Sequence, residues 1–172
     1  MSRWNEPEAF FGITGWKNSG KTTMTERLVT CLTARGYRIA TIKHAHHNFD
    51  IDHEGTDSWR HRKAGAAEVA IVSSQRYAIM HENLGEEEPS LREIAAKLAP
   101  CDLVLVEGYK RETHKKIELR RQGSHDGPAL SRDDPTILAI ASDQPQPDEA
   151  VPVFDINDIE KIADFIEGEM AL

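Results

Sequence analysis

The chain has 172 residues, of which 39% are hydrophobic and 29% are charged, a balance typical of a globular domain. The net charge of −8 argues against a general nucleic-acid binder, because such a protein needs a basic surface. The sequence has neither an apolar run that approaches a membrane span nor a leader-like start. Cys31 and Cys101 lie far apart, as expected in a reduced compartment. We therefore expect one cytoplasmic domain over residues 1–172.

A strand, a glycine-rich loop and a helix are the first predicted elements. Residues 9–14 form a short apolar run, and residues 24–32 carry a helical apolar face that should end near Gly36. Between them, residues 15–22 read Gly-Trp-Lys-Asn-Ser-Gly-Lys-Thr and fit G-x-x-x-x-G-K-[ST], the phosphate-binding loop of P-loop nucleotidases. The sequence therefore predicts binding of a nucleoside triphosphate. The alternative is a glycine turn before an ordinary helix.

Each fixed position of this loop has a chemical role. Gly15 and Gly20 allow turns and a close backbone approach to phosphate oxygens that a Cβ would prevent. Lys21 can reach the β- and γ-phosphates, and the Thr22 hydroxyl is a natural Mg²⁺ ligand. The following helix directs its unpaired N–H groups at the same phosphates.

The middle of the chain should add a strand over residues 38–43, a short helix over residues 57–65 and a hairpin. The hairpin strands are residues 68–73 and 76–81, joined by a tight turn, and we expect them to form an antiparallel edge of a mainly parallel sheet. Ser90 and Glu93 form a capping box for the next helix.

Residues 103–106 are a continuous apolar run, as expected for a strand buried on both faces, and Glu107 follows directly. An acid at this place is the pattern of the Walker B element, whose carboxylate organises Mg²⁺. The usual residue is aspartate, so Glu107 departs from the pattern. The alternative is an ordinary acid at the end of a strand.

Six basic residues crowd residues 110–121 of a chain that is acidic elsewhere: Lys110, Arg111, Lys115, Lys116, Arg120 and Arg121. Residues 116–121 alternate like a half-exposed strand. The stretch is either a solvated face or a seat for an anionic ligand or an acidic partner.

The last predicted elements are a buried strand over residues 136–141, a short strand over residues 151–154 and a final helix. Asp143 follows the first of these strands closely. Asn157 and Glu160 form a capping box at the start of the helix.

Several blocks together resemble the molybdopterin-guanine dinucleotide biosynthesis protein B family, the GTP-binding accessory proteins of molybdenum cofactor maturation. The resemblance covers nearly the whole chain, and the phosphate loop is its least specific part. The blocks are Gly12–Gly15 with Asn18–Thr23, Ile42–His47, Arg62–Ala66, Val106–Lys110, Ala141–Asp143 and Asp155–Asp158.

The resemblance implies an α/β P-loop fold, a homodimer, GTP with Mg²⁺ as ligand and slow GTP hydrolysis. It also implies partnership with molybdopterin guanylyltransferase, and contact with molybdopterin is a further expectation. Carried over by position, Lys21 and Glu107 are the catalytic residues, and Thr22 and Glu107 hold the metal. Asp143 is the candidate for reading the base, because the common Asn/Thr-Lys-x-Asp guanine motif is absent. The remaining nucleotide-binding candidates are Gly15, Lys17, Asn18, Ser19, Gly20, Lys21, Thr22, Thr23 and His46.

The histidine-rich stretch allows three interpretations. His44, His46 and His47, with Asp50 or Asp52, have the chemistry of a transition-metal site. The stretch also follows a strand at the edge where ligands bind, so a switch-like loop that touches the γ-phosphate, Mg²⁺ or the pterin is favoured. The third interpretation is a polar surface loop.

Three rival functions remain open at this point. A small-molecule or nucleoside kinase shares the phosphate loop, although an arginine-rich lid is not evident. A metal-delivery GTPase, for nickel or a similar ion, would use the histidines as ligands. A pure binding module would have only vestigial hydrolysis.

Overall fold

A computed structural model describes residues 9–45, 49–124 and 127–172. The chain divides into two compact units, which are described separately. The first comprises Met1–His44 and Leu91–Leu172, and the second comprises Ala45–Ser90. None of the described helices is both long enough and apolar enough to cross a membrane.

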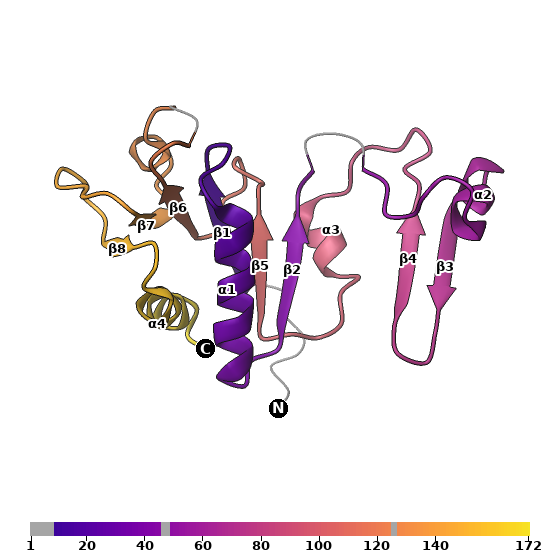
Figure 1. The fold of residues 1–172 in the computed structure, drawn as a ribbon, viewed down its shortest axis with the longest axis horizontal. Coiled ribbons are helices and arrows are strands. Elements are labelled where there is room, and N and C mark those ends of the chain that lie inside the picture. The colour runs from indigo at the N-terminus through magenta and orange to yellow at the C-terminus, as the bar shows by residue number, and fades with distance from the viewer. Residues whose placement is uncertain (1–8, 46–48, 125–126) are drawn as a thin grey trace. The chain divides into compact units, whose positions relative to one another are not determined.

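The first unit is built on a parallel sheet of six strands (Figure 1). Because all the strands run in one direction, their carboxyl ends lie at one edge, where ligands bind in open α/β sheets. The sequence prediction of a mainly parallel sheet is confirmed. In spatial order the strands are β2 (Ile39–Lys43), β5 (Leu103–Glu107), β1 (Phe10–Gly15), β6 (Lys116–Arg120), β7 (Ile137–Ser142) and β8 (Val153–Asp155).

Helices cover both faces of this sheet. On one face, Phe11 and Ile13 of β1 pack in a core with residues of α1 (Lys21–Ala34) and α4 (Ile159–Met170). On the other face, Phe10 and residues of β5 pack against α3 (Leu91–Ala95). Successive side chains of a strand point to opposite faces, so the continuous apolar runs of β1 and β5 serve two cores at once.

Strand β6 corrects the expectation of a half-exposed strand. It pairs with β1 on one edge and β7 on the other, and its charged side chains are buried, since Lys116 and Glu118 are 0% and 1% exposed. The alternation of charged and apolar residues therefore gives β6 one buried apolar face and one buried charged face. Ile117 and Leu119 join the core with α1 and α4, whereas the charged side chains point to the other face.

The β6–β7 connection explains this charged face. It contains only the short 3₁₀ helix η2 (Leu130–Arg132) among its described residues, instead of an apolar α-helix. The Lys116 ammonium donates to the Asp134 carboxylate (3.2 Å) and the Thr136 hydroxyl (2.6 Å) at the end of this connection. Buried polar groups need such partners, and here they attach the crossing segment to the sheet.

Helix α4 begins one residue later than the predicted capping box. Asp158, and not Asn157, is the N-cap, and its carboxylate accepts from the backbone N–H of Lys161 (3.3 Å). Asp and Asn are equally good N-caps, so the sequence pattern alone does not choose between neighbouring positions.

The second unit contains α2 (Asp57–Lys63) and a hairpin of β3 (Glu68–Val72) and β4 (Tyr77–His81). The hairpin prediction is confirmed, but its position as a sheet edge is wrong, because β3 and β4 form a separate two-stranded sheet. The hairpin turn sets the register of β3 against β4 alone, so the sequence pattern does not determine whether the hairpin also pairs with the larger sheet. The Arg62 guanidinium of α2 forms ion pairs with Asp50, Asp52 and Glu82, which link α2 to the segments before it and after β4.

Candidate functional site

The glycine-rich loop connects β1 to α1 as the motif requires, at the carboxyl edge of the sheet. Gly15, Asn18 and Gly20 have positive φ angles of 144°, 65° and 91°. A Cβ on Gly15 would lie 2.6 Å from the Ser19 hydroxyl and 2.7 Å from the backbone oxygen of Leu119. Only glycine fits there, which explains the first fixed position of the motif.

The Lys21 side chain lies within the loop. Its ammonium donates to the backbone oxygens of Gly15 (3.0 Å) and Trp16 (2.8 Å). Burial lowers the pKa of Lys21; the Glu107 charge opposes this shift, and the charges of Lys110 and Lys43 add to it. A phosphate anion would stabilise a cation in this position.

Glu107 lies beside the loop because β5 is the neighbour of β1, with Ile13 and Glu107 in register. Its carboxylate accepts from the Thr22 hydroxyl (3.2 Å) and pairs with the Lys43 ammonium (3.3 Å). Lys43 ends β2 directly opposite Glu107. Sequence reasoning missed Lys43, although it ends a predicted strand at the same sheet edge.

The Thr22 hydroxyl and the Glu107 carboxylate lie side by side, and oxygens of this kind are the donors that Mg²⁺ prefers. Both line a pocket of about 410 Å³ whose other residues come from the loop and the first turn of α1. Gly15 and Ser19 are buried residues of the same loop, and the Ser19 hydroxyl has no hydrogen-bond partner among the described residues. The pocket is lined by Lys17, Asn18, Gly20, Lys21, Thr22, Thr23 and Glu107.

Asp143 lies elsewhere on the same edge, just after β7. Both of its carboxylate oxygens accept from the backbone N–H of Gln122, at 3.0 and 3.2 Å. It lines a second pocket, of about 440 Å³, together with Trp16 of the glycine-rich loop. The loop therefore borders both pockets, because Trp16 lines one and Lys17 the other.

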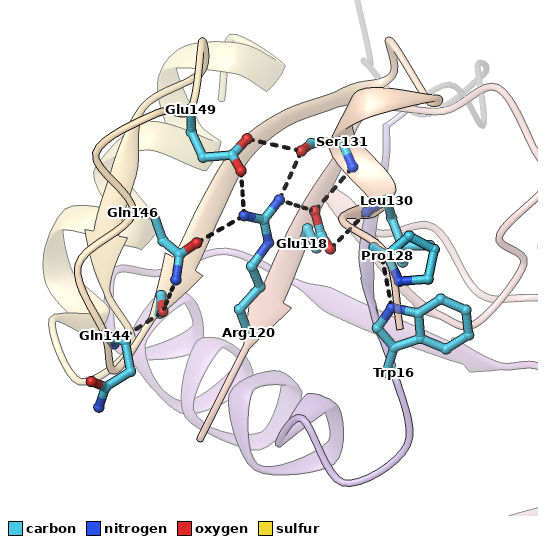
Figure 2. A network of polar contacts seen from close by, with 10 residues as sticks. Trp16, Glu118, Arg120, Pro128, Leu130, Ser131, Gln144, Gln146 and Glu149 are labelled. Atoms are coloured by element: carbon cyan, nitrogen blue, oxygen red, sulfur yellow. Dashed lines mark hydrogen bonds and ion pairs between the residues drawn. The ribbon is translucent and has the colours of Figure 1, made fainter. Parts of the chain in front are cut away.

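A buried ionic network forms one side of this second pocket (Figure 2). The Arg120 guanidinium pairs with Glu118 (2.9 Å) and Glu149 (2.5 Å) and donates to Ser131 (2.8 Å). Glu118 also accepts from the backbone N–H groups of Leu130 and Ser131, both at 3.0 Å. A carboxylate is favourable at these N–H groups because it satisfies the start of η2.

These contacts correct both interpretations of the basic stretch for Lys116 and Arg120. Lys116 is buried and pairs with Asp134, and Arg120 pairs with the buried Glu118, so the two are neither a solvated face nor a free anionic seat. Lys115 is exposed and pairs with Glu169 at 2.9 Å. Their acids lie in part far along the chain, so the basic run could not reveal them.

The histidine stretch lies only partly within the described residues. The His44 ring packs against Tyr109, with 4.6 Å between centroids, whereas His46 and His47 are outside the described part of the chain. Asp50 and Asp52 pair with Arg62. Among the residues with described positions, no three His, Cys, Asp or Glu side chains form a group that could hold a metal.

Comparison with known proteins gives consistent matches. The family model for molybdopterin guanine dinucleotide synthesis protein B matches residues 10–143. The molybdopterin-guanine dinucleotide biosynthesis adapter protein of Escherichia coli (strain K12) is 44% identical over 153 residues, which cover 88% of this chain and 87% of that protein. The adapter protein of Haemophilus influenzae is 42% identical over 166 residues, with 95% and 90% coverage.

The solved structures agree with the sequence matches. The crystal structure of a molybdopterin-guanine biosynthesis protein B aligns with a TM-score of 0.73 at 27% identity, over 95% of this chain and 99% of that one. A MobB homologue from Bacillus stearothermophilus aligns with a TM-score of 0.66 at 26% identity, over 94% and 97%.

Proposed function

The chain belongs to the molybdopterin guanine dinucleotide synthesis protein B family, and from this membership we propose that it is a GTP-binding adapter of molybdopterin-guanine dinucleotide biosynthesis. One observation carries the nucleotide part of the proposal. Lys21 and Thr22 of one motif and Glu107 of another, 85 residues after Thr22, line a single pocket at the end of the parallel strands. This is the cation and oxygen-ligand set that a magnesium-bound triphosphate needs.

The residues of the pocket have separate roles in this proposal. Lys21 and the N-terminus of α1 bind the phosphates, and the buried Ser19 hydroxyl is a further donor. Thr22 and Glu107 would hold Mg²⁺, which neutralises phosphate charge when it is bound. Among the described residues, the pocket lining has a single carboxylate and no histidine or glutamine to orient an attacking water, which supports slow hydrolysis.

We place the base of the nucleotide in the second pocket. Guanine presents N1–H and an exocyclic amino group side by side, and the Asp143 carboxylate can accept from both. Its bonds from Gln122 fix the carboxylate at the rim and leave further acceptor capacity on both oxygens. Trp16 and Lys17 are neighbours in the loop that border the two pockets, so one nucleotide can occupy both.

The proposal extends to partners. The names of the relatives describe an adapter, and molybdopterin guanylyltransferase, with its molybdopterin substrate, is the partner that this role requires. A homodimer is supported by the hairpin apolar face, which we define as Ala70, Val72, Tyr77 and Ile79. These residues share one face of β3 and β4 and are all exposed, and a two-stranded sheet is marginal alone. The free thiols Cys31 and Cys101 suit the cytoplasm.

The test is to measure GTP binding by a Lys21→Ala variant with calorimetry in the presence of Mg²⁺. Removal of the cation that faces the β- and γ-phosphates should abolish measurable binding, with an unchanged circular dichroism spectrum. Lys97→Gln is the matched control, because Lys97 is exposed and precedes the amino end of β5. The Lys97→Gln protein should bind GTP normally. Unchanged GTP affinity in a folded Lys21→Ala protein would contradict the proposal.

Capture of guanylyltransferase tests the adapter role separately. The purified protein should retain molybdopterin guanylyltransferase from a mixture of the two, with a stoichiometry that size-exclusion chromatography measures. Elution of the two proteins as separate peaks at every nucleotide condition would leave GTP binding without an adapter function.

A further inference from the structure

The chain turns sharply after Glu107, and the turn directs the next residues toward the phosphate loop. Gly108 and Tyr109 both have positive φ angles, of 94° and 48°. A Cβ on Gly108 would lie 3.0 Å from the Cβ of His44, and the Tyr109 ring packs on the His44 ring. A non-glycine residue in this region costs about 1–3 kcal/mol, so its surroundings must hold it there.

Lys110 follows this turn and lies on a residue of the phosphate loop. Its ammonium is 4.4 Å from the centroid of the Trp16 ring, within the range of a cation–π interaction. Among the described residues, Lys110 has no carboxylate within ion-pair distance. Its position therefore depends on an aromatic ring and leaves its charge uncompensated.

The Trp16 ring itself is fixed. Its Nε1–H donates to the backbone oxygen of Pro128 (2.9 Å), as Figure 2 shows. A Cβ on Gly127 would lie 2.1 Å from the ring, so the segment at residues 127–128 lies directly against it. Trp16 is thus a rigid support for the Lys110 ammonium.

Lys110 and Lys21 both contact Trp16. The backbone oxygen of Trp16 accepts from the Lys21 ammonium, and its ring carries Lys110. The Lys110 and Lys43 charges both lower the pKa of Lys21, after the larger effect of burial. The Glu107 charge opposes them, and Glu107 is already paired with Lys43. Close cations with so little compensation are a seat for a polyanion.

We infer that Lys110, supported on Trp16, is a second phosphate-binding cation of the nucleotide site. This inference rests on the proposed function and adds a residue to it. Lys110 neutralises part of the polyphosphate charge, so its contribution increases with the number of phosphates on the ligand. The chain has a net charge of −8, so a local group of cations is a site that distinguishes itself from the rest of the surface in its attraction for anions.

The experiment compares the affinities of Lys110→Gln and wild type for GTP, GDP and guanosine by calorimetry. Lys110→Gln should weaken GTP binding by roughly five- to thirtyfold and GDP binding by less, while guanosine binding stays the same. The loss for GTP should shrink between about 0.05 M and about 0.5 M salt, because salt screens the charge. Lys110→Arg keeps a cation that can lie on the ring and should restore GTP affinity to within about threefold.

Two further variants separate the possible outcomes. Lys97→Gln removes the same charge near the opposite end of β5 and should bind all three ligands as wild type does. Trp16→Leu should reduce the effect of Lys110→Gln in a double-mutant cycle, because the support is gone. Equal losses for GTP and guanosine, or no loss beyond that of Lys97→Gln, would overturn the role of Lys110. Retention of GTP by Lys21→Ala would instead overturn the nucleotide site itself.

Discussion

Asp143 is the residue on which the choice of base depends in the proposed site. Adenine presents an acceptor at N1, so the carboxylate would face a lone pair instead of a donor. An unpaired charged group of this kind costs about 1–3 kcal/mol or more. Its exposed position and its bonds to the Gln122 N–H define where the base edge should lie.

We therefore expect wild type to prefer GTP to ATP by roughly tenfold to a few hundredfold. Asp143→Asn should lose this preference and accept xanthosine triphosphate, whose base offers an additional oxygen to the new amide. A competition titration with the three nucleotides measures both effects. An unchanged order of affinities in the variant would mean that another group reads the base. Asp148→Asn, in the same β7–β8 connection, is the control.

His114 is a second residue with a measurable consequence. Its ring lies against Gly12, where a Cβ would be 2.5 Å from Nε2, and neither buried ring nitrogen has a hydrogen-bond partner among the described residues. Burial lowers the pKa of His114 to about 4; the Lys116 charge adds to this shift, and the Asp134 charge opposes it.

The lowered pKa predicts a loss of stability in acid. Above pH about 6.5 the histidine is neutral in both states, whereas between about 6.5 and about 4 the unfolded chain binds a proton that the folded protein rejects. As the pH falls from about 6.5 to about 4, the free energy of unfolding should therefore decrease more steeply in wild type than in His114→Gln. Urea denaturation at several pH values measures the difference. Parallel pH profiles would show that His114 is not buried in its neutral form.

At the scale of elements, strand β6 depends on charges rather than on an apolar helix for its cover. Lys116, Glu118 and Arg120 lie on one face and bind the β6–β7 connection and the loop before β8. Removal of one partner of a buried pair leaves the other uncompensated, which is far more costly than loss of a surface pair.

Glu118→Gln should lower the free energy of unfolding by about 1–3 kcal/mol, because the amide loses the charge that accepts from the Leu130 and Ser131 N–H groups, while Glu149 still compensates Arg120. Chemical denaturation at neutral pH checks this value. Glu26→Gln, at an exposed position of α1, should change it by less than about 0.5 kcal/mol. A Glu118→Gln protein as stable as the Glu26→Gln control would show that the network adds nothing to stability.

At the scale of the whole molecule, the hairpin apolar face is an exposed apolar surface of the second unit. Val72, Tyr77 and Ile79 are 74%, 71% and 61% exposed. We expect a second copy to cover this face, since pairing of like surfaces gives a closed dimer.

The double variant Tyr77→Lys with Ile79→Lys should be monomeric at concentrations where wild type is a dimer, because two charges would be buried at the interface. Light scattering after size-exclusion chromatography measures the mass. Val153→Lys, at an exposed apolar position on β8, should leave the dimer intact. A dimeric double variant would place the interface elsewhere, and a monomeric wild type would remove the homodimer from the proposal.

The sequence alone determined most of the elements and the place of the glycine-rich loop between β1 and α1. Strand and helix periodicity, glycine turns and the G-x-x-x-x-G-K-[ST] motif depend on residues close together in the chain, so β1, α1 and β5 were predicted nearly to their ends. Parallel strands share one carboxyl edge, and this is why Thr22 and Glu107 could be assigned to one site before the strand order was known.

Only the tertiary structure decided which side chains meet across the sheet. The order β2-β5-β1-β6-β7-β8 brings Lys43 to Glu107, and it buries the charged face of β6, which local alternation predicted as exposed. Trp16 and Pro128 are 112 residues apart, and Lys110 reaches Trp16 through a strained turn. Such contacts depend on non-local packing, which the local patterns of a single sequence do not contain.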